Sequence, residues 1–152
     1  MQQALARFYY IELSDYEKAA FWAKTAIKRK PNNDFINDTL GQVYKNQLKN
    51  QNLKKPCDIL QIARQAFKAF EEEAETAEKE LEQGMQEDGV TNSSTVFNYR
   101  GLFGYIQVAN TLFYKLEKAN PEWSKVLRRE TNSQTLIDSL KSVENTKLSS
   151  EA

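Results

Sequence analysis

The sequence predicts an all-α fold in which antiparallel helices form a short, irregular solenoid of repeats. Three observations predict it. Tyr10 and Tyr44 are 34 residues apart in two similar helical segments, and 34 residues is the period of a known helix–turn–helix repeat. Apolar residues recur at helical spacing in every long segment. The 152 residues include only five glycines and three prolines, too few for many strands and tight turns. We therefore expect five long helices and one or two short ones.

The first two predicted helices cover residues 2–13 and 16–30. Asp15 stands where it can cap the second helix. Ala19 and Ala26 belong to an apolar stripe along that helix, and residues 28–30 place basic charge at its carboxyl end, which suits the helix dipole. Pro31 ends the helix because proline cannot continue it.

The next two helices are predicted to be longer. Asn33 or Asp34 caps the third helix, and the polar stretch 49–56 follows it as a loop. Asp58 is expected to cap the fourth helix, which ends at Gly84 and Gly89. A loop is predicted over residues 85–95.

The segment 96–118 is the most apolar, and we expect a central helix packed on two sides. Each of Gly101 and Gly104 costs about 1 kcal/mol relative to alanine in such a helix, so close backbone packing is expected there. Two short helices follow, after Pro121 and near Leu136. Residues 1–140 are predicted to form one domain, with a disordered tail over 141–152. The aromatic residues of the central helix are expected in its core: Phe97, Tyr99, Phe103, Tyr105 and Phe113.

The 34-residue period is that of the tetratricopeptide repeat, and the predicted fold is tetratricopeptide-like. About ten extra residues near 49–57 interrupt the pattern, so the match is good over 15–44, partial to residue 70 and weak beyond it. A generic helical bundle is the alternative. The residues that match the packing positions of the repeat are Tyr10, Ala19, Ala26, Pro31, Leu40, Gly41, Tyr44, Ala63 and Phe67.

Composition argues against an enzyme. The chain has no histidine, which removes histidine-based acid–base catalysis and most zinc sites. Cys57 is the only cysteine, so no intrachain disulfide can form. No motif points to a catalytic, cofactor or metal site, and no apolar run approaches the length that spans a membrane. We expect a cytoplasmic protein, and a fragment of a longer one because helical sequence directly follows Met1.

A repeat of this kind holds another molecule, so we expect a protein or peptide partner or another domain of the same chain. The cationic clamp that some tetratricopeptide proteins use for a peptide carboxylate is not expected, because Ala4, Phe8 and Thr39 occupy its positions. The inner surface of the first two repeats is expected to present a mixed apolar and amide groove: Phe8, Ile11, Glu12, Phe35, Asp38, Gln42, Lys45 and Asn46.

Charge along the chain is segregated, although the net charge is zero. Residues 18–68 contain eleven lysines and arginines against three acids, whereas residues 71–88 contain nine acids and one lysine. The basic stretch allows a second interpretation, an RNA-contacting helical module, although its cations are scattered over two helices and a loop. A third interpretation is an internal spacer whose groove is covered by neighbouring domains.

Two stretches of sequence resemble one particular family. They are FYYIELSDYEKAAFWAKTAIKRKPNNDFINDTLGQVYKNQLKN and GLFGYIQVANTLFYKLEK, and they resemble the interferon-inducible sterile alpha motif domain-containing protein 9 family over residues 1 to about 140. The resemblance implies a helical repeat region in the C-terminal half of a large cytoplasmic protein that restricts poxviruses, represses translation and limits cell growth. The nucleic-acid-binding and nucleotide-hydrolysing regions of such proteins lie elsewhere, so no catalytic residue carries over.

Overall fold

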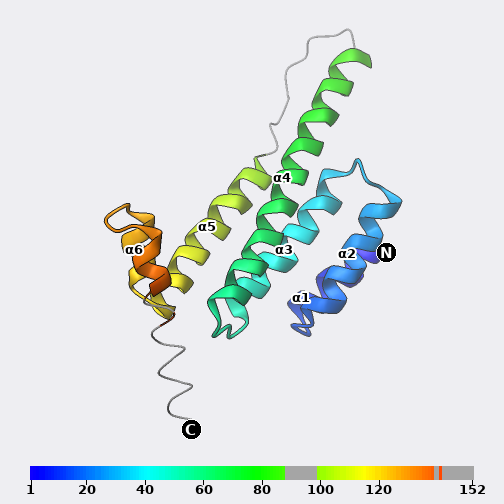
Figure 1. Ribbon diagram of the computed structural model, residues 1–152. Helices are drawn as coiled ribbons and strands as arrows, with labels where there is room; N and C mark the ends of the chain where they lie inside the picture. Colours follow the sequence, from blue (N-terminus) through cyan, green and yellow to red (C-terminus); the bar gives the residue numbers. More distant parts are fainter. Residues whose placement is uncertain (88–98, 139–140, 142–152) are drawn as a thin grey trace. The chain divides into compact units, whose positions relative to one another are not determined.

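The computed structural model describes residues 1–87, 99–138 and 141. The chain divides into two compact units, Met1–Leu112 and Phe113–Ala152, and each is described by itself. No strand occurs in the described ranges, and residues 133–138 form a further helix. The prediction of an all-α fold is confirmed. The helices are α1 (Gln2–Ile11), α2 (Tyr16–Arg29), α3 (Asp34–Asn50), α4 (Pro56–Glu87), α5 (Arg100–Ala119) and α6 (Glu122–Leu127) (Figure 1).

Side chains cap two of the helices at the predicted residues. The Asp15 carboxylate accepts a hydrogen bond of 3.1 Å from the Lys18 amide at the start of α2. The Asn33 side chain accepts one of 3.1 Å from the Ile36 amide at the start of α3. Each bond satisfies an amide that has no partner within its own helix.

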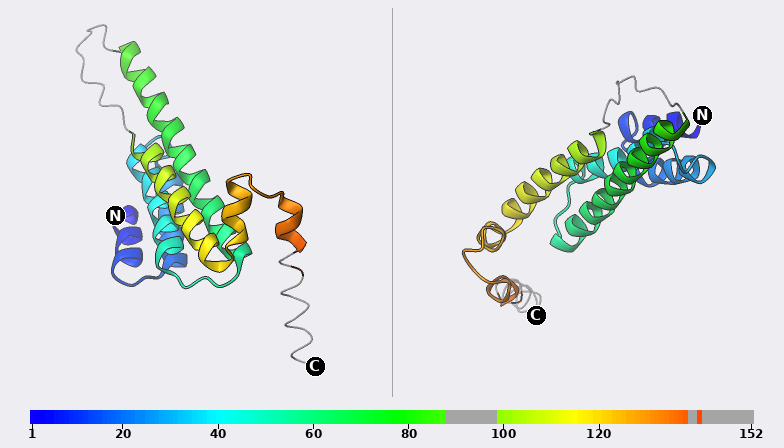
Figure 2. Two further views of the ribbon diagram at one scale, coloured as in Figure 1. Left: turned by 90° about the vertical axis from the view of Figure 1, so that its left-hand side faces the viewer. Right: turned by 90° about the horizontal axis from the view of Figure 1, so that it is seen from above.

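The bounds of α4 differ from the prediction. The helix begins at Pro56, so Asp58 lies in its first turn. Proline is tolerated there because the amide that it lacks would have no helical partner. The helix also passes Gly84 and ends at Glu87, so the predicted end at Gly84 is wrong. Residues 85–87 of the predicted loop are helical, and its remainder lies outside the described residues. The last turns of α4 extend beyond the other helices of the first unit (Figures 1 and 2).

The contacts between helices in the first unit follow a regular order. Helix α1 contacts α2 and α3, α2 also contacts α3, and α3 contacts α4. Small residues fill the places where the first helices meet, because Ala6, Ala19 and Ala23 have no exposed surface. Side chains of this size let neighbouring helices approach closely. Successive helical hairpins therefore stack on one another.

Helices α1, α3 and α5 run in the same direction. The Gln3 side chain of α1 bonds to Phe35 and Thr39 of α3, 32 and 36 residues later. Between α3 and α5, one hydrogen bond joins Asp34 to Arg100 and a second joins Lys45 to Gln107. Both members of the second pair lie further along their helices, so α3 and α5 are parallel. Helices α1 and α3 are each joined to α2 by a short turn and pack on it, so they also run in the same direction. Helix α4 runs against α3, since Asn37 bonds to Thr76 whereas Gly41, one turn further along α3, meets the earlier residue Phe70.

The ring of Phe70 is the centre of this core. It is fully buried, and it lies against two glycines on different helices. A β-carbon at Gly41 would stand 2.5 Å from the ring, and one at Gly104 would also overlap it. At Gly101 a β-carbon would meet the Glu73 carboxylate. The close backbone packing expected at Gly101 and Gly104 is thus confirmed, and α5 packs on α4 through them.

The prediction that α5 is packed on two sides is wrong. Leu102 and Ile106 are exposed, and the Phe103 side chain is 65% exposed. Tyr99 and Tyr105 also have exposed surface, although the Tyr105 ring lies 4.4 Å from that of Phe67. These aromatic residues therefore do not form a core. Apolar density predicted the helix correctly, but it did not show that only one face meets other helices of the unit.

The second unit contains the end of α5, then α6 and the helix over 133–138. Phe113 is half-buried in this unit, and Phe97 lies outside the described residues. The Asn120 side chain accepts a hydrogen bond of 3.0 Å from the Glu122 amide, the first residue of α6. Leu136 is buried. The single domain over residues 1–140 and the disordered tail stay predictions.

Candidate functional site

A groove lies between the three parallel helices of the first unit. Its more enclosed part is a cavity of about 280 Å³ to which α1, α3 and α5 all contribute side chains. Amides, aromatic rings and charged groups are all represented, so the surface is chemically mixed. The cavity is lined by Gln3, Arg7, Tyr10, Phe35, Asp38, Thr39, Gln42 and Arg100.

Two amide side chains that line the cavity form hydrogen bonds with groups of α3. The Gln3 amide donates bonds of 3.0 Å to the Phe35 carbonyl and to the Thr39 hydroxyl, and so joins α1 to α3. The Gln42 amide donates a bond of 3.2 Å to the Asp38 carboxylate one turn earlier on α3. These bonds hold the positions of the polar groups before any ligand arrives, which lowers the entropy that binding would cost.

Arg100 connects α5 to the start of α3. Its guanidinium lies 3.3 Å from the Asp34 carboxylate and 3.8 Å from the centre of the Phe35 ring. The other oxygen of Asp34 accepts a bond of 2.7 Å from the Phe35 amide. Ion pairing and cation–π stacking therefore orient Arg100 together. The Phe35 side chain nevertheless stays 57% exposed, which leaves apolar surface for a partner.

A second contact between α3 and α5 lies two to three turns further along. The Lys45 ammonium donates a bond of 2.8 Å to the Gln107 carbonyl oxygen. Burial lowers the pKa of Lys45, against the opposing effect of the nearby Asp38 carboxylate. The Asn46 amide donates to the Gln42 carbonyl at 2.7 Å, so it is committed to its own helix.

A more open cavity of about 490 Å³ continues the groove toward the loop between α2 and α3. It shares Gln3, Arg7 and Phe35 with the first cavity and adds Ala4, Lys30, Asn33 and Ile36. The Arg7 and Lys30 side chains are exposed, and neither forms an ion pair with any described residue. This end of the groove therefore carries positive charge.

The predicted groove residues fall into two groups. Phe35, Asp38 and Gln42 line the cavity of about 280 Å³, and Lys45 and Asn46 follow on the same helix. The α1 residues Phe8, Ile11 and Glu12 are exposed but line neither cavity. Sequence reasoning missed Gln3, Arg7, Lys30 and Arg100. Arg7 lies one turn before the predicted groove residue Ile11, and this spacing could have indicated that Arg7 faces the groove. Nothing in the sequence indicated that α5 would bring Arg100 to Phe35.

The predicted repeat-packing residues are mostly internal. Six of the nine are buried: Ala19, Ala26, Leu40, Gly41, Tyr44 and Ala63. Tyr10 and Phe67 are half-buried, and Pro31 is exposed. The aromatic residue that meets Gly41 is Phe70, one turn after the predicted Phe67.

A buried carboxyl group, not expected from the sequence, lies behind the groove. Glu73 on α4 has no exposed surface, and it lies beside Gly101 of α5. Burial raises the pKa of Glu73 to about 7, with further upward contributions from Asp38 and Asp34 and a downward one from Arg100. The charge state of this group near neutral pH is therefore linked to the packing of α3, α4 and α5.

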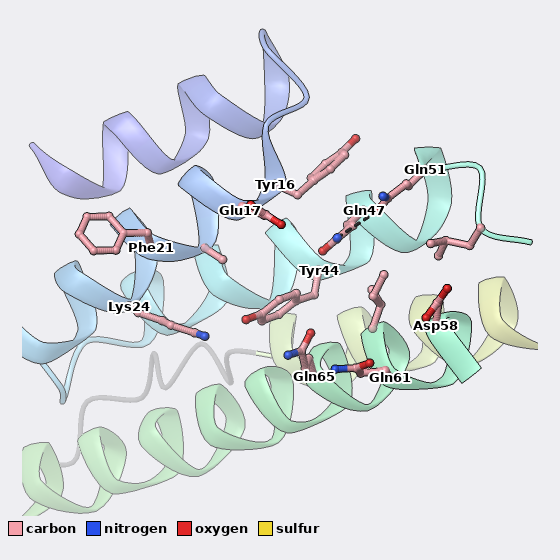
Figure 3. A pocket seen from close by; sticks show the side chains of 13 residues that line it. Tyr16, Glu17, Phe21, Lys24, Tyr44, Gln47, Gln51, Asp58, Gln61 and Gln65 are labelled. Carbon is pink, nitrogen blue, oxygen red and sulfur yellow. Dashed lines mark hydrogen bonds between the residues drawn. The ribbon is translucent and has the colours of Figure 1, made fainter. Parts of the chain in front are cut away.

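A separate cavity of about 580 Å³ lies between α2, α3 and α4 (Figure 3). Lys24 and Tyr44 point toward one another there, with the ammonium 5.9 Å from the ring centre. Gln47 and Gln51 bond to each other along α3 at 3.0 Å, and Gln61 and Gln65 project from α4. Its polar groups include four glutamine amides, and it shares no residue with the groove.

The basic residues of the stretch 18–68 lie on α2, on α3, on the loop after it and on α4. Ten of the eleven are exposed and Lys45 is half-buried.

Cys57 is exposed. The described part of the chain holds no group of three or more His, Cys, Asp or Glu side chains suited to a metal ion. None of the helices in the described ranges has both the length and the apolar character that a bilayer crossing needs.

The chain is similar to segments of much larger proteins. It is 36% identical over 106 residues to mouse (Mus musculus) sterile alpha motif domain-containing protein 9-like, which is 70% of this chain and 6% of that protein. It is 34% identical over 119 residues to human (Homo sapiens) sterile alpha motif domain-containing protein 9, again 70% of this chain and 7% of that protein.

The human protein 9-like is 40% identical over 80 residues, which cover 46% of this chain and 5% of that protein. No family model matches the chain, and no solved structure matches it. The chain thus spans less than a tenth of the length of these relatives, and it belongs to the sterile alpha motif domain-containing protein 9 family.

Proposed function

We propose that this chain is a tetratricopeptide-like protein-interaction segment of the sterile alpha motif domain-containing protein 9 family, and that the groove between α1, α3 and α5 holds a segment of a partner protein. The observation that carries the proposal is the groove itself. Three parallel helices present an exposed aromatic ring, ordered amides and charged groups along one continuous surface. Such a surface is suited to peptide recognition by shape and a few anchors.

The repeat assignment is supported by the order of the helices. In stacked helix–turn–helix repeats, the first helix of each repeat lies parallel to the first helix of the next. The bonds from Gln3 to Phe35 and Thr39 span 32 and 36 residues, on either side of the 34-residue period. The offset between α3 and α5 is 62 to 66 residues. The second repeat is therefore lengthened, in keeping with the long helix α4.

The proposal extends to the setting in which the segment acts. On the resemblance described above, we propose a cytoplasmic, interferon-induced protein that restricts viruses and cell growth, with this segment as a scaffold and not an enzyme. The groove side chains support that role, because the Gln3 and Gln42 amides are already hydrogen-bonded to groups of α3 and are held in place for contacts with a partner.

Two other functions make different predictions. An RNA-contacting module would bind through the exposed cations of residues 18–68, and its affinity would fall steeply with salt. An internal spacer would have its groove covered by neighbouring domains, so substitutions in the groove would leave every intermolecular partner bound. The Asp38 carboxylate that lines the groove favours the protein-binding function, since it would repel a phosphate backbone lying along the groove.

Affinity capture with the purified chain tests the proposal. The wild type is compared with Phe35→Ala and Gln42→Ala, which remove an apolar anchor and an ordered amide. Phe21→Ala is the matched control, because Phe21 is 61% exposed on α2 and lines no part of the groove. We expect one or more cytosolic proteins to be retained by the wild type and the control and lost from both groove variants. Equal retention by all four proteins, each verified as folded by circular dichroism, would contradict the proposal.

A further inference from the structure

One end of the groove combines an exposed aromatic ring with unpaired positive charge. The ring of Phe35 is covered on one side by the guanidinium of Arg100, and more than half of its side chain is exposed. Arg7 of α1 and Lys30 at the end of α2 line the cavity that borders this ring. Three cations from different elements therefore surround one apolar contact surface.

The charges are not balanced within the groove. Arg100 is paired with Asp34, which lies outside both cavities. Asp38 is the acid among the residues that line them, and it accepts a bond from Gln42. Arg7 and Lys30 have no acidic partner among the described residues. Asp38 lies about one helical turn from Phe35 toward the opposite end of the groove. The charge of the groove therefore differs between its ends, with unpaired cations at the Lys30 end and the Asp38 carboxylate further along.

We propose that the groove recognises an acidic, extended protein segment that places one apolar side chain on Phe35 and carboxylates beside Arg7 and Lys30. The inference rests on the proposed protein-binding function and specifies the chemistry of the partner. Complementary charge would orient the segment and speed its encounter, whereas the apolar contact would supply much of the affinity.

A nucleic acid fits this site less well than an acidic peptide. A phosphate backbone carries charge at every step, and continuing along the groove it would meet the Asp38 carboxylate. A peptide can place neutral residues there and keep its acids at the Lys30 end. Arg7 and Lys30 lie on different elements, so the proposed segment must present separate anionic groups to them. Carboxylate side chains along a peptide can do this.

The test uses the 152-residue chain and a fluorescently labelled short peptide. The probe is built of glutamate and serine with one central phenylalanine, acetylated and amidated so that neither terminus is charged. A matched probe carries glutamine at each glutamate. Fluorescence anisotropy at low salt should show the acidic probe binding at least about tenfold more tightly, with affinity that falls as salt rises.

Three variants assign the binding to the groove. Arg7→Glu combined with Lys30→Glu should weaken the acidic probe by about tenfold or more, since two attractive contacts become repulsive. Phe35→Ala should weaken it several-fold through loss of apolar contact. The control is Lys54→Glu with Lys55→Glu, which makes the same change in net charge at exposed residues outside both cavities and should leave the affinity unchanged.

Several outcomes would overturn the inference. They are equal affinity for the two probes, no binding of either, equal weakening in the control pair, or an oligouridylate that binds as tightly as the acidic peptide and is lost in the same groove variants. The proposed function would fail separately, through equal capture of cellular proteins by wild type and groove variants. A capture that depends on Phe35 together with no preference for acidic probes would retain the function and remove this inference.

Discussion

Ionisation of Glu73 should make the stability of the first unit depend on pH. The carboxyl group has no exposed surface and lies between α4 and α5, beside Gly101. Burial is the largest cause of its raised pKa, and the carboxylates of Asp38 and Asp34 add to it, while Arg100 opposes them. Replacement by glutamine keeps the size of the side chain and removes the charge. The contribution of Glu73 to the pH dependence of stability should therefore disappear in Glu73→Gln.

The pKa shift sets the size of the effect. The pKa of Glu73 rises from 4.5 to about 7 on folding, which corresponds to about 3 kcal/mol. The folded state binds the proton more tightly than the unfolded state, so this stabilisation is fully present below about pH 4.5 and is lost as pH rises through about 7. Relative to the wild type, Glu73→Gln should gain about 3 kcal/mol between about pH 4.5 and pH 8.

Urea denaturation at several pH values measures this difference. Trp22 reports on the first unit, so both proteins should carry Trp123→Phe to remove the signal of the second unit. Glu75→Gln is the control, because Glu75 is exposed on the same helix and its replacement should change stability equally at every pH. The reasoning is refuted if the difference between Glu73→Gln and the wild type is the same at low and high pH.

Three other changes test the packing and the caps. Gly41→Ala should destabilise the protein by about 1 to 2 kcal/mol in urea denaturation, since the overlap of the new methyl group with the Phe70 ring outweighs the gain in helix propensity. Adding Phe70→Leu should recover part of this loss. Strictly additive effects of the two substitutions would contradict the contact. Asn33→Ala should lower the melting temperature by removing a cap of about 1 kcal/mol, whereas Asn32→Ala, at an exposed neighbour, should not. Asp34→Asn should speed hydrogen exchange in the first turns of α5, measured by mass spectrometry, because it breaks the ion pair that holds that end; unchanged exchange would show that the pair does not anchor the helix.

Local signals predicted most of the fold. Asp15 and Asn33 cap the helices that they were expected to cap, because a cap depends only on the next few residues. Ala19 and Ala26 of α2 are buried as expected, since they repeat at helical spacing. Pro56 shows the limit of such signals. A helix can start with proline in its first turn or with an aspartate cap at Asp58, and the sequence did not decide between these two starting points.

Contacts between distant helices were less predictable. Phe67 and Phe70 belong to one apolar stripe, and which of them meets Gly41 depends on how α3 and α4 align across the loop. Glu73 is one acid within a run of acids, and its burial follows from the docking of α5 through Gly101. Periodicity along one helix contains no information on such alignments.

The candidate groove was predicted in outline and not in detail. Phe35, Asp38 and Gln42 line it as expected on α3, because helical spacing determines which residues share a face. The cations at its end were missed. Arg7 and Arg100 reach the groove only because α1 and α5 flank α3 on opposite sides, and that arrangement was not readable from charge patterns.

Site-specific photo-crosslinking in cell extract tests the central claim most directly. Benzoylphenylalanine in place of Phe35 puts a reactive ring in the groove, and the same residue in place of Phe21 puts one on the exposed surface of α2, where exposure is similar. The groove account predicts a discrete protein adduct at position 35 and none of that mass at position 21, with the adduct reduced by Gln42→Ala. An adduct of equal yield at both positions, or none at position 35, would contradict it.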